Sequence, residues 1–313
     1  MSVQFPEEVR LAAERHAVQF DRKLLSKAAA ELSARYREEE ADGSVIAGSD
    51  IQAAAYSVVR MPATFAAVSR ALELSLACYG GELHSCADVG AGTGAAALAA
   101  MQLTDEPELL HCYERADAMR KLGSELVPAA QWYSADITKV PLPRSYDLVI
   151  AGYVFNELTD AQREAAILSL WSRTDGMLLI TEPGTMKGYR CILQARELLI
   201  KNGALIAAPC PAVTSCPLPE NDWCHFTARA ARSKLHKQLK DGDVPYEDEK
   251  FSFIAAVRSD ASVCERRILR HPEISGGMIG LHVCTAEGIG DMKVTRSSKL
   301  FKSARKAACG DSL

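Results

Sequence analysis

The sequence lacks a long apolar run. Nowhere in its 313 residues does a stretch approach the ~18 consecutive apolar residues of a membrane-spanning helix, so we expect no contact with a membrane. The N-terminus, MSVQFPEEVRLAAERH, also lacks the apolar core of a secretory signal, and it carries the acids Glu7, Glu8 and Glu14, which are rare in transit peptides. These absences favour a cytoplasmic protein, most simply a bacterial one.

Without an export signal, the ten cysteines indicate a reducing compartment, where cysteines are reduced, buried or bound to metal. The hydrophobic fraction of 48% and the charged fraction of 24% are those of an ordinary globular protein.

Residues 1–80 are predicted to form a helical region. Apolar residues recur at spacings of three and four in VRLAAERHAVQF and LLSKAAAELSARYREEE, and the glycine-containing ADGSVIAGSD interrupts the pattern. We expect Asp50 to cap a helix through Val59, and Pro62 to begin the next helix in its first turn.

Residues 81–206 alternate between strand and helix patterns, as in a doubly wound α/β sheet. Strands are expected at 84–89, 109–114, 131–134, 146–151 and 176–182, and helices near 94–103, 116–127, 160–173 and 188–202. Right-handed crossovers place the ligand at the carboxyl ends of such strands. A third region, 207–313, is expected to add the last strands of the sheet.

The segment HSCADVGAGTGAAALAAM has the order strand, glycine turn, helix. Gly90, Gly92 and Gly94 allow positive φ and a close approach of a ligand to the first N–H groups of the helix. A dinucleotide uses this geometry, with Glu114 about 20 residues on to hold a ribose. Read together with Asp88, two residues before the first glycine, the same loop resembles the first motif of the S-adenosylmethionine (SAM) methyltransferases. We favour SAM because Asp88 has no role in the dinucleotide fingerprint. A glycine turn without a ligand is the third alternative.

Two further acids end predicted strands. Glu114 closes the second strand, where its two acceptor oxygens suit the ribose hydroxyls. Asp136 follows the third strand and is placed to accept a hydrogen bond from an adenine amino group.

The signature of methyl transfer is less clear. SAM carries an activated methyl group, so a protein mainly aligns donor and acceptor and manages a proton. After the fourth strand, GYVFNEL lacks the Asn-Pro-Pro-Tyr signature of DNA-type amino-methylating enzymes, and the cysteine that a cytosine-C5 enzyme needs is also missing. The candidate catalytic residues are Asn156, Glu157 and Glu182, the two glutamates as proton acceptors.

Three cysteines lie close together in AAPCPAVTSCPLPENDWCHF, namely Cys210, Cys216 and Cys224, and two are followed by proline. Proline stiffens the loop, as in iron–sulfur ligation runs, whereas a zinc ribbon would more usually pair its cysteines as C-x2-C. A fourth thiolate has to come from downstream. The candidates are Cys264, Cys284 and Cys309. We favour Cys284, because it ends a short apolar run in GLHVCTAEG and a strand end makes a rigid ligand.

Two segments of the chain are basic although its net charge is −4. Residues 225–240 contain five basic residues and no acidic one, and residues 291–313 contain six basic and two acidic ones. Such segments fit a nucleic-acid partner, although solvated helix faces give the same pattern.

Six motifs follow one another along the chain: RMPAT from Arg60, the glycine loop from Asp88, EPG from Glu182, the cysteine loop ending WCHF and followed by Arg229, then EKFSF and LHVCTAEG. Together they resemble the methyltransferase-like family of the mitochondrial small ribosomal subunit and its bacterial relatives. The resemblance covers nearly the whole chain after residue 50, and the cysteine loop is its most specific part.

The resemblance implies a SAM-methyltransferase core and a 4Fe-4S cluster, with zinc as the alternative. Carried over by motif, the ligands are Cys210, Cys216, Cys224 and Cys284. Members of the family are associated with maturation of the small ribosomal subunit and are proposed to methylate its RNA. We therefore predict a SAM-dependent methyltransferase-like protein that acts on the small ribosomal subunit and its rRNA and is monomeric when free.

Two alternatives remain. One is an assembly factor that binds SAM or RNA without turnover and uses the cluster as a structural element or redox sensor. The other is a small-molecule methyltransferase with a zinc site.

Within the predicted function, the basic segments follow the cluster ligands along the chain. We expect the cluster to bring both segments together into one phosphate-binding surface. The candidate RNA-binding residues are Arg229, Arg232, Lys234, Lys237, Lys299, Lys302, Arg305 and Lys306.

Overall fold

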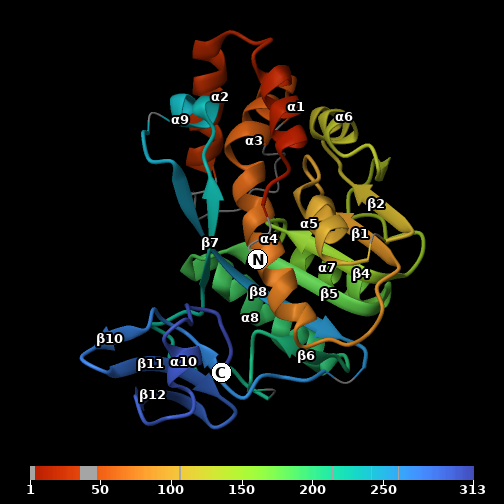
Figure 1. Ribbon diagram of the computed structural model, residues 1–313. Helices are drawn as coiled ribbons and strands as arrows, with labels where there is room; N and C mark the ends of the chain where they lie inside the picture. The colour runs from red at the N-terminus through yellow and green to blue at the C-terminus, as the bar shows by residue number, and fades with distance from the viewer. Residues whose placement is uncertain (1–3, 36–47, 106, 213, 241, 260) are drawn as a thin grey trace.

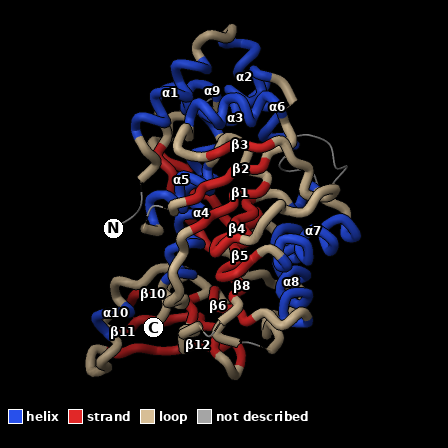
Figure 2. The backbone as a smooth tube through the Cα atoms, turned by 90° about the vertical axis from the view of Figure 1, so that its right-hand side faces the viewer, coloured by secondary structure: helices blue, strands red, loops and turns tan. Residues whose placement is uncertain are grey.

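The computed structural model describes residues 4–35, 48–105, 107–212, 214–240, 242–259 and 261–313. A central sheet lies between two layers of helices, with the N-terminal helices at one end and a small second sheet at the other (Figures 1 and 2). The predicted α/β architecture is confirmed.

The helices are α1 (Glu7–Ala17), α2 (Arg22–Arg35), α3 (Asp50–Val59), α4 (Met61–Leu76), α5 (Ala95–Leu103), α6 (Asp117–Leu126), the 3-10 helix η1 (Phe155–Glu157), α7 (Asp160–Ser172), α8 (Met186–Lys201), α9 (Lys234–Leu239) and α10 (Phe301–Ala304). The strands are β1 (Ser85–Val89), β2 (Leu109–Tyr113), β3 (Gln131–Tyr133), β4 (Tyr146–Gly152), β5 (Thr174–Pro183), β6 (Leu205–Ala208), β7 (Phe226–Ala231), β8 (Tyr246–Val257), β9 (Arg267–Ile268), β10 (Glu273–Ser275), β11 (Met278–Thr285) and β12 (Gly288–Thr295).

The central sheet has the strand order β3-β2-β1-β4-β5-β8-β6, and β7 pairs with the first half of β8 (Figure 2). Strands β1 to β5 are parallel, whereas β8 runs antiparallel to each strand with which it pairs, β5, β6 and β7. The order reverses between β1 and β4, which is where a doubly wound sheet opens a ligand crevice. This is the doubly wound, Rossmann-like arrangement that the sequence predicted.

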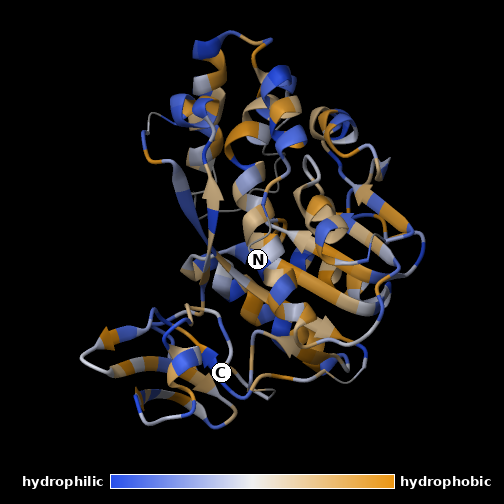
Figure 3. Ribbon diagram, in the orientation of Figure 1, coloured by the Kyte–Doolittle hydropathy of each residue, from blue (hydrophilic) through white to orange (hydrophobic). Residues whose placement is uncertain are grey.

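Both faces of the central strands β1, β4 and β5 are buried, which explains why these strands are mostly apolar (Figure 3). On β5, Met177 and Leu179 belong to the core under α4 and α5, while Leu178 and Ile180 belong to the core under α7 and α8. All four side chains are at most 1% exposed.

The N-terminal helical region packs α1 and α2 against α3. Its helix over 50–59 is capped one residue earlier than expected. Ser49, and not Asp50, is the cap: its hydroxyl accepts from the Gln52 N–H, and the Gln52 side chain accepts from the Ser49 N–H in return. The end of the predicted helix over 24–40, together with residues 41–47, lies outside the described residues.

The C-terminal region is divided between two sheets. Its strands β7 and β8 join the central sheet, and β9 to β12 form a second sheet with its own small apolar core that includes Ile268, Ile279 and Val294. The cysteine loop lies between β6 and β7, and Cys284 lies on β11 of the second sheet. The three loop cysteines and the fourth predicted ligand therefore come from opposite sides of the junction between the sheets (Figure 1).

Candidate functional site

The glycine loop connects β1 to α5 at the reversal point of the sheet. Gly90, Gly92 and Gly94 have φ of +67°, +57° and +93°, which L-residues rarely adopt. A Cβ atom on Gly90 would lie 2.4 Å from Cγ2 of Val154, so glycine is also required there by the close approach of the β4 loop.

Glu114 holds this loop in place. The Gly92 N–H donates to its Oε2 at 2.8 Å, and the Ala116 N–H donates to its Oε1 at 2.7 Å. The side chain is buried, which raises its pKa, while these two N–H donors act in the opposite direction. Each carboxylate oxygen keeps a second lone pair for a ligand hydroxyl.

Asp88 does not line the pocket beside this loop. Its Oδ2 accepts a hydrogen bond of 2.9 Å from the Ala97 N–H in the first turn of α5, and the side chain is 1% exposed. Burial raises the pKa of Asp88 to about 7. Asp88, the acid of the glycine motif, therefore fixes the start of the glycine loop to the first turn of α5.

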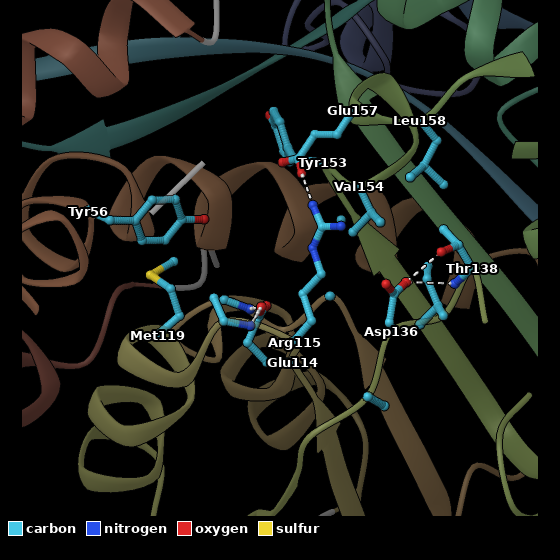
Figure 4. A pocket seen from close by; sticks show the side chains of 16 residues that line it. Tyr56, Glu114, Arg115, Met119, Asp136, Thr138, Tyr153, Val154, Glu157 and Leu158 are labelled. Carbon is cyan, nitrogen blue, oxygen red and sulfur yellow. Dashed lines mark hydrogen bonds and ion pairs between the residues drawn. The ribbon is translucent and has the colours of Figure 1, made fainter. Parts of the chain in front are cut away.

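Asp136 lies on the rim of the pocket (Figure 4). Thr138 donates to its Oδ1 from both the backbone N–H, at 3.0 Å, and the hydroxyl, at 2.6 Å, and the Lys139 ammonium lies 3.2 Å from Oδ2. Partial burial works to raise the pKa of Asp136, but these donors outweigh it and hold the pKa below its ordinary value.

The pocket encloses about 740 Å³ including its open mouth. The side chains and backbone around it come from α3, the glycine loop, and the segments after β2, β3 and β4. The lining residues are Tyr56, Gly90, Gly92, Glu114, Arg115, Ala116, Met119, Ala135, Asp136, Ile137, Thr138, Gly152, Tyr153, Val154, Glu157 and Leu158. Arg115 and Glu157 reach toward each other across it, with 3.8 Å between Nη2 and Oε2 (Figure 4).

Tyr153 adopts φ of +62°, the one positive value among the described non-glycine residues. Such a conformation is strained for a tyrosine and persists only where the surroundings fix it. The hydroxyl donates to Oε1 of Glu249 at 3.0 Å, and Glu249 also pairs with Arg60 at 3.1 Å. Arg60 of the RMPAT motif is thus connected through β8 to the wall of the pocket.

The three candidate catalytic residues occupy different places. Glu157 lines the pocket. Glu182 is fully buried and accepts from the N–H groups of Phe155, at 2.8 Å, and Asn156, at 3.2 Å, so it supports the turn after β4. Burial raises the pKa of Glu182 to about 7. Asn156 does not line the pocket, and its Oδ1 has no partner among the described residues.

The sequence analysis missed Arg115, Tyr153 and Tyr56. Arg115 follows Glu114 at a strand end, and Tyr153 belongs to the GYVFNEL segment after β4, so position alone could have indicated both. Tyr56 comes from α3 and reaches the pocket only through the packing of α3 on α6, for which the sequence gives no signal.

The four predicted thiolate ligands line a second cavity, of about 570 Å³ including its open mouth. Cys210, Cys216 and Cys224 come from the loop between β6 and β7, and Cys284 comes from β11. The remaining lining residues are mainly apolar. In the described part of the chain, no three His, Cys, Asp or Glu side chains are arranged to hold a single metal ion.

The other two candidates for the fourth ligand lie next to this cavity without lining it. The Cys309 thiol donates to the Leu269 carbonyl at 3.2 Å, and the Cys264 thiol lies 4.0 Å from the Pro209 carbonyl. The arrangement thus favours Cys284 over Cys264.

The two basic segments do not meet. Helix α9 packs near α2 and α3 at the top of Figure 1, whereas α10 lies beside β12 at the bottom. The expected single phosphate-binding surface is therefore wrong, because β7 carries the first segment away from the cysteine loop.

Three of the first segment's cations are already paired with acids of β8, and one of them is Lys240, whose ammonium lies 3.0 Å from Glu247. The Arg229 guanidinium donates to Asp248 at 2.7 Å, and that of Arg232 donates to Glu247 at 2.8 Å. By contrast, Lys299, Lys302, Arg305 and Lys306 are exposed and form no ion pair within the described residues.

A family described as mitochondrial small ribosomal subunit Rsm22 matches residues 50–313. The human ribosome assembly protein METTL17, mitochondrial, is 25% identical over 289 residues, which cover 82% of this chain and 61% of that protein. The Rsm22-cox11 tandem protein 2, mitochondrial, of Schizosaccharomyces pombe is 27% identical over 218 residues, or 60% of this chain and 28% of that protein. The chain thus spans less than two thirds of the length of either relative.

Solved structures with partial likeness include the magnesium protoporphyrin IX methyltransferase of Synechocystis with bound SAH, at 16% identity and a TM-score of 0.42, covering 76% of this chain and 97% of that one. The N-methyltransferase NodS of Bradyrhizobium japonicum has 12% identity and a TM-score of 0.41, covering 61% and 84%. Similarity this low gives no basis for assigning the ligands of those two proteins to this chain.

The comparisons overturn the predicted cytoplasmic, bacterial location. The matching family is one of the mitochondrial small ribosomal subunit, and the curated relatives are mitochondrial proteins. Among the described residues, no helix has both the length and the apolar character needed to cross a membrane.

Proposed function

The chain belongs to the Rsm22 family of the mitochondrial small ribosomal subunit, and from this we propose that it acts in assembly of the small ribosomal subunit as a SAM-binding protein. The family match over residues 50–313 and the similarity to a ribosome assembly protein support the assembly role. The partner is the subunit itself and its rRNA, and the free protein is a monomer.

The bond from Gly92 to Glu114 carries the proposal of SAM binding. It joins the glycine loop to the end of β2, so that loop N–H groups and a buried carboxylate face one pocket. In our proposal Glu114 accepts from the ribose hydroxyls and Asp136 from the adenine amino group. Gly90, Gly92 and Gly94 let the ligand approach the backbone, and Asp88 keeps the loop in position.

Methyl transfer to rRNA is a second candidate activity. SAM, when bound, supplies an activated methyl group, and the protein has to align the acceptor and accept a proton. Glu157 is the one of the three candidate residues that faces the pocket. Its pairing with Arg115 and the structural contacts of Glu182 favour binding without turnover as the principal function.

Labelled SAM distinguishes the two activities. We would measure SAM binding by calorimetry and methyl incorporation into small-subunit particles that lack this protein, for wild type, Glu114→Ala and Glu157→Gln. Binding without incorporation supports the assembly factor. Incorporation that Glu157→Gln abolishes while SAM still binds establishes the methyltransferase. If wild type binds no SAM, the proposed ligand is wrong, and incorporation into a small molecule but not into particles supports the small-molecule enzyme.

For the cysteine cavity we propose a 4Fe-4S cluster held by Cys210, Cys216, Cys224 and Cys284. Four thiols face one cavity, as such a cluster needs. A zinc ion bound at about 2.3 Å from each sulfur is the alternative occupant of the same four cysteines. When bound, the cluster supplies an inorganic cross-link between the loop and β11 and can exchange an electron.

For rRNA contact we propose the exposed cations Lys299, Lys302, Arg305 and Lys306 at the C-terminal end. Lys234 and Lys237 form a second, separate site near α2. Arg229 and Arg232 serve mainly to pair β7 with the acids of β8.

A further inference from the structure

Two buried arginines face the cysteine cavity. Arg196 on α8 and Arg267 on β9 are each 2% exposed, and both line the cavity together with the four thiols. Neither forms an ion pair with a carboxylate in the part of the chain that the structure describes. Burial disfavours a guanidinium that has no counter-charge, so an anion in the cavity would stabilise both side chains.

Both guanidiniums hold the backbone around the cysteines. Arg267 donates from Nε to the Pro209 carbonyl and from Nη1 to the Gly310 carbonyl, each at 2.9 Å. Arg196 donates to the carbonyls of Ala212, at 2.9 Å, and Thr214, at 3.3 Å. Pro209 and Ala212 lie on either side of Cys210 in the sequence. The two arginines therefore fix the backbone of the first part of the loop by hydrogen bonds before and after this cysteine.

Each arginine also retains an unused donor. Nε of Arg196 and Nη2 of Arg267 are buried and have no hydrogen-bond partner among the described residues. Buried donors of this kind are rare in folded proteins. The other two nitrogens of each guanidinium already donate to backbone carbonyls, so Nε of Arg196 and Nη2 of Arg267 are the nitrogens left without any acceptor among the described residues.

The cavity offers few other sources of negative charge. No aspartate or glutamate is among the described residues that line it, which leaves the four thiols and the Tyr189 hydroxyl as groups that can become anionic. Burial raises the pKa of the Cys210 thiol, and the charges of Arg196 and Arg267 act against that rise. Cysteine binds metal as the thiolate, and the two guanidiniums lie where four thiolates would need a counter-charge.

Helix α8 presents one face to this cavity, with Tyr189, Ile192, Leu193 and Arg196 at spacings of three and four. The Tyr189 hydroxyl lies 3.2 Å from Sγ of Cys216. This face of α8 therefore contacts Cys216 through Tyr189, and through Arg196 it contacts the backbone two residues after Cys210.

We propose that Arg196 and Arg267 are positioning residues for an anionic metal–sulfur group in the cysteine cavity: their backbone hydrogen bonds hold the loop open, and their charges offset the negative charge of the four thiolates. This rests on the proposed 4Fe-4S cluster. It adds to that proposal the residues that determine how firmly the cluster is retained and how readily it is reduced.

The test compares two variants. Arg267→Met removes the positive charge, whereas Arg267→Lys keeps the charge but cannot form both backbone hydrogen bonds of the guanidinium. Arg163→Met is the matched control, because Arg163 is also buried and also donates to backbone carbonyls but lies outside the cavity. Each full-length protein is purified and reconstituted without oxygen. The readouts are the midpoint potential of the cluster, followed by visible absorbance during reductive titration, and the rate of iron loss to a chelator.

Reduction adds negative charge to a cluster, and nearby positive charge favours it. We therefore expect the midpoint of Arg267→Met to shift in the negative direction and its iron to be lost several-fold faster. Arg267→Lys should keep a midpoint near that of wild type, and Arg163→Met should leave both readouts unchanged. If Arg267→Met does not fold, Arg196→Met and Arg196→Lys replace the pair with the same expectation.

Two results would overturn the inference in distinguishable ways. A wild-type protein that holds neither iron nor sulfide after anaerobic reconstitution overturns the cluster and the arginine role together. A wild-type cluster whose midpoint and retention are the same in the Met and Lys variants overturns the arginine role alone and leaves the cluster standing.

Discussion

The backbone N–H of Gly92 donates to Oε2 of Glu114 across 22 positions of sequence, at 2.8 Å. This hydrogen bond fixes the glycine loop to the residue that follows β2. A ligand that contacts the loop therefore contacts a backbone whose position depends on one buried carboxylate.

Glu114→Ala should weaken SAM binding about 10- to 100-fold, the range expected when a charged hydrogen-bond acceptor is removed from a buried site. The variant removes both the support of the loop and the proposed acceptor for the ribose hydroxyls. Isothermal titration calorimetry measures the change, and Glu164→Ala, an exposed acid on α7, is the control. Equal affinities for the two variants would contradict the proposed site.

Asp88 should make stability depend on pH. Its pKa in the folded protein, about 7, lies above its ordinary value of 3.8. Folding therefore takes up a proton between these values, so the stabilising contribution is fully present below pH 4 and is lost as pH rises through about 7. The expected loss in this window is about 1.4 kcal/mol per pH unit.

Urea unfolding at pH 5 and pH 8 measures this effect as the difference between wild type and Asp88→Asn. The asparagine keeps an oxygen for the Ala97 N–H but cannot titrate. A wild type whose pH dependence equals that of the variant would show that Asp88 titrates normally.

Removing Arg60 should destabilise the protein by about 3 kcal/mol, because it leaves the mostly buried Glu249 without its cation. Arg60→Met tests this by chemical denaturation. The exposed pair of Arg229 and Asp248 is the comparison, and Arg229→Met should cost about 1 kcal/mol or less. A small effect of Arg60→Met would mean that the Tyr153 hydroxyl suffices to hold Glu249.

Cys284→Ser should abolish the iron and sulfide of anaerobically purified protein, whereas wild type should hold about four of each. Cys264→Ser and Cys191→Ser, the latter a buried cysteine of α8 outside the cavity, should retain them. Absence of iron in Cys264→Ser but not in Cys284→Ser would exchange the two assignments. Zinc without sulfide in wild type would replace the cluster by a single ion.

Changing Lys299, Lys302, Arg305 and Lys306 to glutamine should weaken binding to small-subunit rRNA. The slope of log affinity against log salt should fall by about 0.7–0.9 for each phosphate that the protein no longer neutralises. Arg229→Gln with Arg232→Gln should leave the slope nearly unchanged, since both cations are paired with acids. The opposite ranking in filter binding at several salt concentrations would move the RNA site to β7.

The sequence predicted those features that local chemistry determines. The parallel strands could be located because burial on both faces makes them almost wholly apolar, and the glycine loop because few other residues adopt its φ values. The glycine and cysteine motifs also led to residues that line two cavities, as the geometry of Glu114 and Cys284 illustrates.

Features that depend on pairing between distant segments were not predictable in the same way. Asp88 turns toward α5, where its carboxylate accepts from the Ala97 N–H, and Arg229 meets Asp248 only because β7 and β8 pair in one particular register. The capping residue of α3 was displaced by one position because Ser49 and Gln52 complete a reciprocal pair that Asp50 cannot form. The cytoplasmic location was inferred from the lack of a recognisable targeting signal in the N-terminal residues, and the mitochondrial relatives contradict it.

The position of β8 has a consequence for folding. This strand separates β5 from β6, which precede it in the chain, so the sheet cannot close at that side until residue 257 has been synthesised. Contacts between such distant segments form slowly, because a long loop has to be ordered first. The cysteine loop lies between β6 and β7, in the part of the chain that is synthesised before β8 can pair. During synthesis its thiols are therefore exposed before their cavity exists, and any metal that they acquire early would be bound by an incomplete site.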